Sequence, residues 1–124
     1  MHVLDSSALI EAIEEGPLAQ KVEDVLKDGA LITTSICMHE LLVGASTEKE
    51  CFVLEGLFSK MRILEFDAKA AKISSRIENR LTKEGKKIGS VDCLIAGICI
   101  ANDAVLVSFD EHFQRIPGLK IAKI

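Results

Sequence analysis

Short apolar runs typical of β-strands alternate with helix-like segments along this 124-residue sequence. The strand-like runs cover residues 2–5, 30–34, 62–66, 104–109 and 119–124. The helix-like segments cover residues 6–16, 17–29, 35–46, 47–61, 67–84 and 90–103, and a short helix is expected from Asp110. Such alternation predicts a parallel sheet covered by helices on both faces. We therefore expect an α/β fold: a single three-layer α/β/α domain over residues 1–124, with a central, mainly parallel sheet of four to five strands.

The apolar content suits a hydrophobic core and not a membrane span. Hydrophobic residues make up 48% of the chain, and no repeat or Pro/Gly/Ser-rich linker divides it. The longest apolar run, Cys93–Ala101, is too short to cross a bilayer. The first residues lack the basic-then-apolar layout of a secretion signal. We expect a soluble, cytoplasmic protein that does not enter a membrane.

Neither the cysteines nor the histidines are spaced like a metal or catalytic site. The four cysteines stand singly in apolar segments without a CxxC pair: Cys37, Cys51, Cys93 and Cys99. Buried, reduced thiols are the better interpretation. The three histidines are scattered: His2, His39 and His112. We interpret them as surface or hydrogen-bonded residues.

Charge is distributed unevenly along the chain, although the net charge is only −4. Residues 1–56 hold eleven acids and three lysines, whereas residues 69–87 hold seven basic residues and two acids. Basic side chains recur there at helical spacing: Lys69, Lys72, Arg76, Arg80, Lys83 and Lys87. This stripe is either a track for a nucleic-acid backbone or an ordinary solvated face.

Two acids come directly after predicted strands. Asp5 follows the first strand, and Asp110 follows the strand at residues 104–109. Carboxyl ends of parallel strands form the usual ligand crevice of α/β folds. Either residue could instead serve only as a helix N-cap. Asp103 is a rival for Asp110, but it precedes its strand and should lie at the opposite end of the sheet.

Two further acids lie in apolar helical segments. Asp92 stands in the run SVDCLIAGICIAND, where the helix dipole favours a carboxylate in the first turn and Ser90 is available as the cap. Glu40 has Ile36, Val43 and Gly44 at spacings of three and four. Neither setting suits a solvated charge.

Together the four acids predict a metal site. Like charges about 4 Å apart repel by roughly 4 kcal/mol at an effective dielectric near 20, so a shared crevice demands protons or a cation. Oxygen ligands alone favour Mg²⁺ or Mn²⁺. Because no Ser-His-Asp set, phosphate-binding loop or GxGxxG motif is present, metal-dependent phosphodiester hydrolysis is the function that remains.

Four motifs in order resemble the PIN-domain family, specifically the VapC-like toxin ribonucleases of toxin–antitoxin pairs. They are VLDSSALI, ICMHELLVGA, KKIGSVDCLIAGICIAND and VLVSFDEHFQRIPGLKI. The last is similar to the family's Thr/Ser-x-Asp-x-x-Phe motif, with Ser108, Asp110 and Phe113 in place. Two departures are Ser90, where many relatives have proline, and Ser108, where threonine is commoner.

The resemblance implies an endoribonuclease that uses Mg²⁺ or Mn²⁺ and forms a homodimer held inactive by a small antitoxin. Its catalytic and metal-binding residues would be Asp5, Glu40, Asp92 and Asp110. The candidates for RNA contact are Ser6, Arg80, Lys86, Lys87 and Ser108. One alternative is a catalytically inactive PIN-like module that binds RNA or protein. Another is a receiver-like signalling domain, although Ser6 and Ser7 stand where it needs a second acid.

Large apolar side chains are numerous in the helical segments at residues 35–43 and 51–61. Those of the second segment include Phe52, Leu54, Leu57, Phe58 and Met61. They either form an exposed patch for a second copy or an antitoxin, or simply fill the core.

Overall fold

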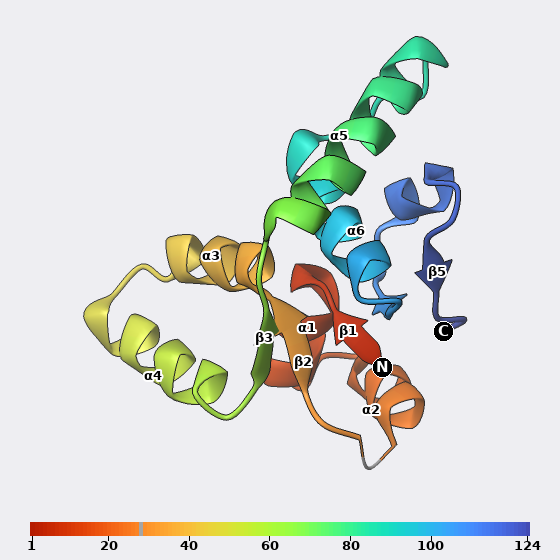
Figure 1. Ribbon diagram of the computed structural model, residues 1–124. Coiled ribbons are helices and arrows are strands. Elements are labelled where there is room, and N and C mark those ends of the chain that lie inside the picture. Colours follow the sequence, from red (N-terminus) through yellow and green to blue (C-terminus); the bar gives the residue numbers. More distant parts are fainter. Residues whose placement is uncertain (28) are drawn as a thin grey trace.

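A computed structural model describes residues 1–27 and 29–124 of the chain. Its strands are β1 (His2–Leu4), β2 (Ile32–Thr34), β3 (Arg62–Leu64), β4 (Val105–Val107) and β5 (Lys120–Ile121). Its α-helices are α1 (Ser6–Ile13), α2 (Ala19–Leu26), α3 (Ser35–Gly44), α4 (Glu48–Phe58), α5 (Ala68–Lys83) and α6 (Ser90–Ala101). A 3₁₀ helix, η1 (Glu111–Arg115), follows β4. Figure 1 shows β1, β2 and β3 near the centre with helices around them, and β5 at the edge near the C-terminus.

The strands are parallel, as predicted, but they do not form one continuous sheet. The order β1-β4-β5 makes a three-stranded sheet, and β2-β3 makes a separate two-stranded sheet. The expected sheet of four to five strands is therefore divided. At the division the Thr33 hydroxyl donates to the Leu4 carbonyl at 2.7 Å, so a side chain connects β1 and β2 where a backbone ladder was expected. β5 lies at the edge of its sheet, as predicted.

Helix α6 fills the centre of the core. Six of its residues are buried: Cys93, Ile95, Ala96, Gly97, Ile98 and Cys99. The neighbouring helix α5 presents Ala70, Ile77 and Leu81 to the core, with Ile73 partly buried. Asp67 caps α5 by accepting the Ala70 N–H at 2.9 Å. The far end of α5 extends away from the strands (Figure 1).

One predicted cap is wrong. Helix α6 begins one residue earlier than expected, because Gly89 is the N-cap and Ser90 is already helical. No side chain of the described residues caps this helix. Helix α2 likewise begins at Ala19, after Pro17, with Leu18 as its N-cap.

The cysteines are free thiols, and three are buried: Cys37, Cys93 and Cys99. Burial raises the pKa of Cys99 to about 12, which keeps this thiol protonated and unreactive. Cys51 is the exception to the predicted burial, since it is half-buried on α4. In the part of the chain that the structure describes, no helix has both the length and the apolar character needed to cross a membrane.

Candidate functional site

Asp5 lies where β1 ends and α1 begins. Its carboxylate accepts the Ala8 N–H at 3.0 Å, so it caps α1. Its backbone N–H donates to the Val107 carbonyl at 3.1 Å, which ties it to the end of β4. The capping role and the position at the carboxyl end of a strand are therefore both correct for this residue.

Two serine hydroxyls hold the Asp5 carboxylate. Ser7 donates to Oδ1 at 2.7 Å and accepts the Phe109 N–H at 3.0 Å. Ser108, which is 8% exposed, donates to Oδ2 and accepts the Asp110 N–H at 3.0 Å. These contacts connect the ends of β1 and β4. They favour a positioning role for Ser108, which was expected to contact RNA.

Asp110 caps η1 just beyond β4. Its Oδ1 accepts the His112 N–H at 2.9 Å, and the same oxygen lies 3.2 Å from the His112 Nδ1. Its rival Asp103 lies before β4, is exposed and pairs with Lys120 at 2.6 Å. Only Asp110 stands at the same end of β4 as Asp5.

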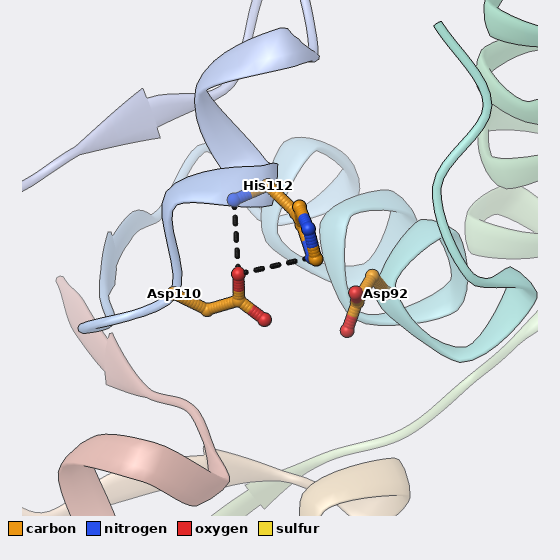
Figure 2. Close-up of side chains that lie close together, drawn as sticks. All are labelled: Asp92, Asp110 and His112. Atoms are coloured by element: carbon orange, nitrogen blue, oxygen red, sulfur yellow. Dashed lines mark hydrogen bonds and ion pairs between the residues drawn. The ribbon is translucent and has the colours of Figure 1, made fainter.

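Asp92 approaches Asp110 from the first turn of α6. One ligand atom each from Asp92, Asp110 and His112 lie within 4.8 Å of one another. Figure 2 shows the three side chains directed toward a common space. We call these residues the Asp92–Asp110–His112 cluster. The fold thus brings together two acids that are 18 positions apart in the sequence and lie on different elements.

The sequence interpretation gave His112 no place at the site, because it treated all three histidines as scattered residues that are at the surface or hydrogen-bonded. It is exposed, as expected, yet its ring faces the acids. The available signal was its position two residues after Asp110, because an aspartate N-cap accepts the N–H of the residue two or three places on. That geometry keeps the two side chains together.

Glu40 does not lie in the apolar environment that the sequence predicted for it. It is exposed, because this face of α3 borders an open cavity of about 800 Å³ between α1, α3 and α4 instead of the core. Val43 on the same helix is 71% exposed. The Ser6 hydroxyl donates to Glu40 Oε1 at 2.8 Å. Asp5 and Glu40 do not belong to the 4.8 Å cluster.

The acids nevertheless share one electrostatic environment. Burial raises the pKa of Asp92, and the carboxylates of Asp110, Glu40 and Asp5 raise it further. Burial also raises the pKa of Asp5, while hydrogen bonds from Ser108, Ser7 and the Ala8 N–H oppose this rise. Burial is the larger cause of both shifts, and the neighbouring carboxylates add to it.

This donor set fits a divalent cation. Burial is the first cause of the raised pKa of Asp92 and the neighbouring carboxylates are the next, so a cation beside them would stabilise the charged form. Carboxylate oxygens suit Mg²⁺ and Mn²⁺, and the imidazole of His112 would add a nitrogen donor that also suits later transition metals. His112 was not among the predicted ligands.

The predicted basic residues lie on two surfaces. Arg80, near the far end of α5, forms an ion pair with Glu84, and its Nε lies 2.9 Å from Glu84 Oε1. Lys86 and Lys87 are exposed in the connection between α5 and α6. Lys86 lines a cavity that also contains Asp110 and His112. The predicted basic residue that lines the same cavity as Asp110 and His112 is therefore Lys86, which is not a member of the basic stripe.

The apolar residues of α4 are divided between core and surface. Phe58 is 4% exposed and belongs to the core, and Leu54 and Met61 pack partly against it. Phe52 is 78% exposed and Val53 is 53% exposed. The helix therefore has large apolar side chains both in the core and at the surface.

The protein has a parallel α/β fold with acids at the carboxyl ends of β1 and β4. Comparison with known families identifies the class of protein that this arrangement defines. The PIN domain family model matches residues 2–119. The chain belongs to the PIN-domain family, which removes the receiver-like alternative.

Curated relatives carry nuclease names. The "tRNA(fMet)-specific endonuclease VapC" of Salmonella typhimurium is 30% identical over 124 residues, which cover 96% of this chain and 94% of the relative. "Ribonuclease VapC2" of Rickettsia felis is 30% identical over 126 residues, with 96% and 94% covered.

Solved structures agree in fold. DNA-bound VapBC from Salmonella typhimurium superimposes with a TM-score of 0.84 at 28% identity, covering 98% of this chain and 96% of the other. VapBC2 from Rickettsia felis, bound to a promoter DNA fragment, gives a TM-score of 0.83 at 26% identity, with 98% and 96% covered.

Proposed function

We propose that this protein is a metal-dependent endoribonuclease that hydrolyses RNA phosphodiester bonds and acts as the toxin of a VapBC-type toxin–antitoxin pair. The observation that carries this proposal is the convergence of Asp92 and Asp110 at the carboxyl end of β4, beside the buried carboxylate of Asp5. The nuclease names of relatives that span nearly the whole chain support it.

In this proposal Asp5, Glu40, Asp92 and Asp110 hold Mg²⁺ or Mn²⁺. When bound, such an ion supplies charge neutralisation for the phosphate and activation of the attacking water. Ser7 and Ser108 orient Asp5, and Ser6 orients Glu40. His112 holds Asp110 through the shared Oδ1. The hydroxyl and imidazole donors thus fix carboxylate geometry before any ligand enters.

The partners follow from the same assignment. The cavity of about 800 Å³ between α1, α3 and α4 is largely apolar, with Ile10, Leu41 and Val53 among its lining residues. We place the antitoxin there, because an apolar segment can bury Ile10 and Val53, which are 44% and 53% exposed. Phe52, on the exposed face of α4, is our candidate for contact between two copies of the chain.

The test is cleavage of purified initiator tRNA, the substrate named for relatives, with Mg²⁺, with Mn²⁺ and with EDTA. Wild-type protein should release discrete fragments only with a metal, and Asp92→Asn should release none at equal concentration. Tight RNA binding without any cleaved product, across initiator tRNA, total tRNA and ribosomal RNA, would favour the catalytically inactive module.

A further inference from the structure

A second cavity shares no lining residue with the apolar one. It has a volume of about 1040 Å³ and is formed by η1 and the connection between α5 and α6. Its lining includes Lys86, Asp110, His112, Gln114 and Arg115. Two members of the Asp92–Asp110–His112 cluster therefore form part of its wall.

Lys86 and Arg115 are the cations of this cavity, and both are exposed. In residues 1–27 and 29–124 neither forms an ion pair within 4.0 Å. The Arg115 Nη1 donates to the Lys87 carbonyl at 3.3 Å, which holds the guanidinium against the α5–α6 connection. Guanidinium has five N–H donors, so most of its donors are still available for a ligand.

The two cavities beside the acids differ in chemistry. The cavity at Ser6 and Glu40 has mainly apolar walls, and its charged lining is three acids, Glu14, Glu40 and Glu50, with one cation, Lys49. That excess of negative charge disfavours a polyanion. In the other cavity, Lys86 and Arg115 balance the charges of Asp110 and Glu111. Arg80 offers less, since Glu84 already occupies it.

We propose that Lys86 and Arg115 form a subsite for an RNA phosphate next to the one held at the acids. The inference rests on the proposed function, because it requires an RNA to approach the acidic site. The Arg115 guanidinium donates two parallel hydrogen bonds to phosphate oxygens, and the Lys86 ammonium attracts the phosphate as a point charge. Glu111 also lines the cavity, and its carboxylate opposes the anion. The sequence had indicated Lys86 but not Arg115, because Arg115 lies outside the basic segment at residues 69–87.

The experiment measures binding of fluorescently labelled initiator tRNA by anisotropy, in EDTA so that metal-dependent cleavage is prevented. Lys86→Ala and Arg115→Ala should each weaken binding about fivefold. The slope of log K against log salt should fall by about 0.7 for each phosphate contact that is lost, and equally for unrelated RNA sequences. Glu111→Gln should change the affinity in the opposite direction.

Matched controls separate this subsite from general electrostatics. Lys21→Ala on α2 and Arg62→Ala on β3 remove the same charges from exposed positions outside the cavity. Both should bind RNA nearly as tightly as wild type. Arg115→Lys should recover part of the affinity, since it keeps the charge but loses the fork. Lys86 lies in an exposed connection, so its removal leaves the fold intact.

Each outcome decides one proposal. Equal affinity of the Lys86, Arg115 and control variants would overturn the subsite, and so would absence of RNA binding by wild type. Cleavage by the wild-type protein would still support the nuclease. Weakened binding confined to Lys86→Ala and Arg115→Ala, with no cleavage by wild type under any metal, would support the subsite and reject the nuclease.

Discussion

Individual carboxylates in this protein carry two roles at once. Asp5 and Asp110 each cap a helix and each stand at the carboxyl end of a strand. The cap fixes the side chain through a backbone N–H, so the remaining oxygen is presented in a defined direction. The sequence analysis treated helix capping and membership of the acidic site as alternatives. In the structure, a carboxylate that caps a helix also lies at the site.

Ser108 provides a test of carboxylate positioning. Its buried hydroxyl donates to Asp5 and accepts the Asp110 N–H. Ser108→Ala should lower the rate of RNA cleavage about 10- to 100-fold, the usual cost of losing a group that orients a metal ligand. Ser108→Thr keeps the hydroxyl and should retain most of the rate. Equal kcat for the alanine and threonine variants would contradict the positioning role.

Removing the charge of Asp92 is expected to stabilise the metal-free protein. Its pKa is raised in the fold by burial and then by Asp110 and Glu40, so its charged form destabilises the metal-free protein. Asp92→Asn should raise the free energy of unfolding in EDTA at pH 7 by about 0.5 kcal/mol after allowance for solvent screening, or roughly 2–4 °C in Tm. The measurement is thermal unfolding by circular dichroism.

The stability gained by Asp92→Asn should depend on pH, because the fold raises the pKa of Asp92. Because the pKa in the folded state lies above the unfolded value, the protonated form is favoured in the fold. The wild-type protein therefore loses stability as pH rises through the folded pKa, and the Asn variant does not lose this part. The difference between them should vanish below the unfolded pKa, near pH 4. A constant difference across pH would contradict this account.

At the scale of elements, the contact between α5 and α6 depends on one glycine. A Cβ at Gly97 would lie 2.7 Å from the Ala70 carbonyl oxygen and 2.8 Å from the Ser74 Cβ. Gly97→Ala should therefore destabilise the protein by about 1–3 kcal/mol, despite the better helix propensity of alanine. Denaturant unfolding monitored by circular dichroism measures the change.

Gly56 in α4 is the matched control for this substitution. A Cβ there meets nothing within 4 Å. Gly56→Ala should stabilise the protein by about 0.5–1 kcal/mol, since only helix propensity changes. Destabilisation of equal size at both positions would show that the close approach of α5 and α6 is not the cause.

The sequence predicted most elements because their boundaries are chemically marked. Asp67 before an apolar stripe and Asp110 after β4 are N-caps in the structure, as their side chains suggest. Ser90 was wrongly expected to cap α6 because serine and glycine are both acceptable N-caps, so the sequence alone does not decide between Ser90 and Gly89. The division of the sheet also lay outside local sequence, since strand pairing depends on elements far apart in the chain.

At the scale of the whole molecule, metal binding should be visible without any RNA. A ligand that binds only the folded state stabilises it by about 2.7 kcal/mol at one hundred times its Kd. Wild-type protein should therefore gain thermal stability as Mg²⁺ or Mn²⁺ is added. The Asp92→Asn and Asp110→Asn variants should gain much less. Equal gains in all three proteins would place the metal elsewhere.

The site itself could be predicted only in part. The sequence indicated Asp5, Asp92 and Asp110 because strand ends and an apolar helix made their charges conspicuous. It misjudged the surroundings of Glu40, because an apolar helix face can line an open cavity as well as a core. It did not indicate His112 or Arg115, which lie near Asp110 and Lys87 only because of the path of η1.

The pairing of β1 with β4 has a consequence for how the protein comes into being. Asp5 and Asp110 are far apart in the sequence, and the pairing of β1 with β4 brings them to one edge of the sheet. The site is therefore absent until these two strands have paired, and any substitution that separates them disperses the acids.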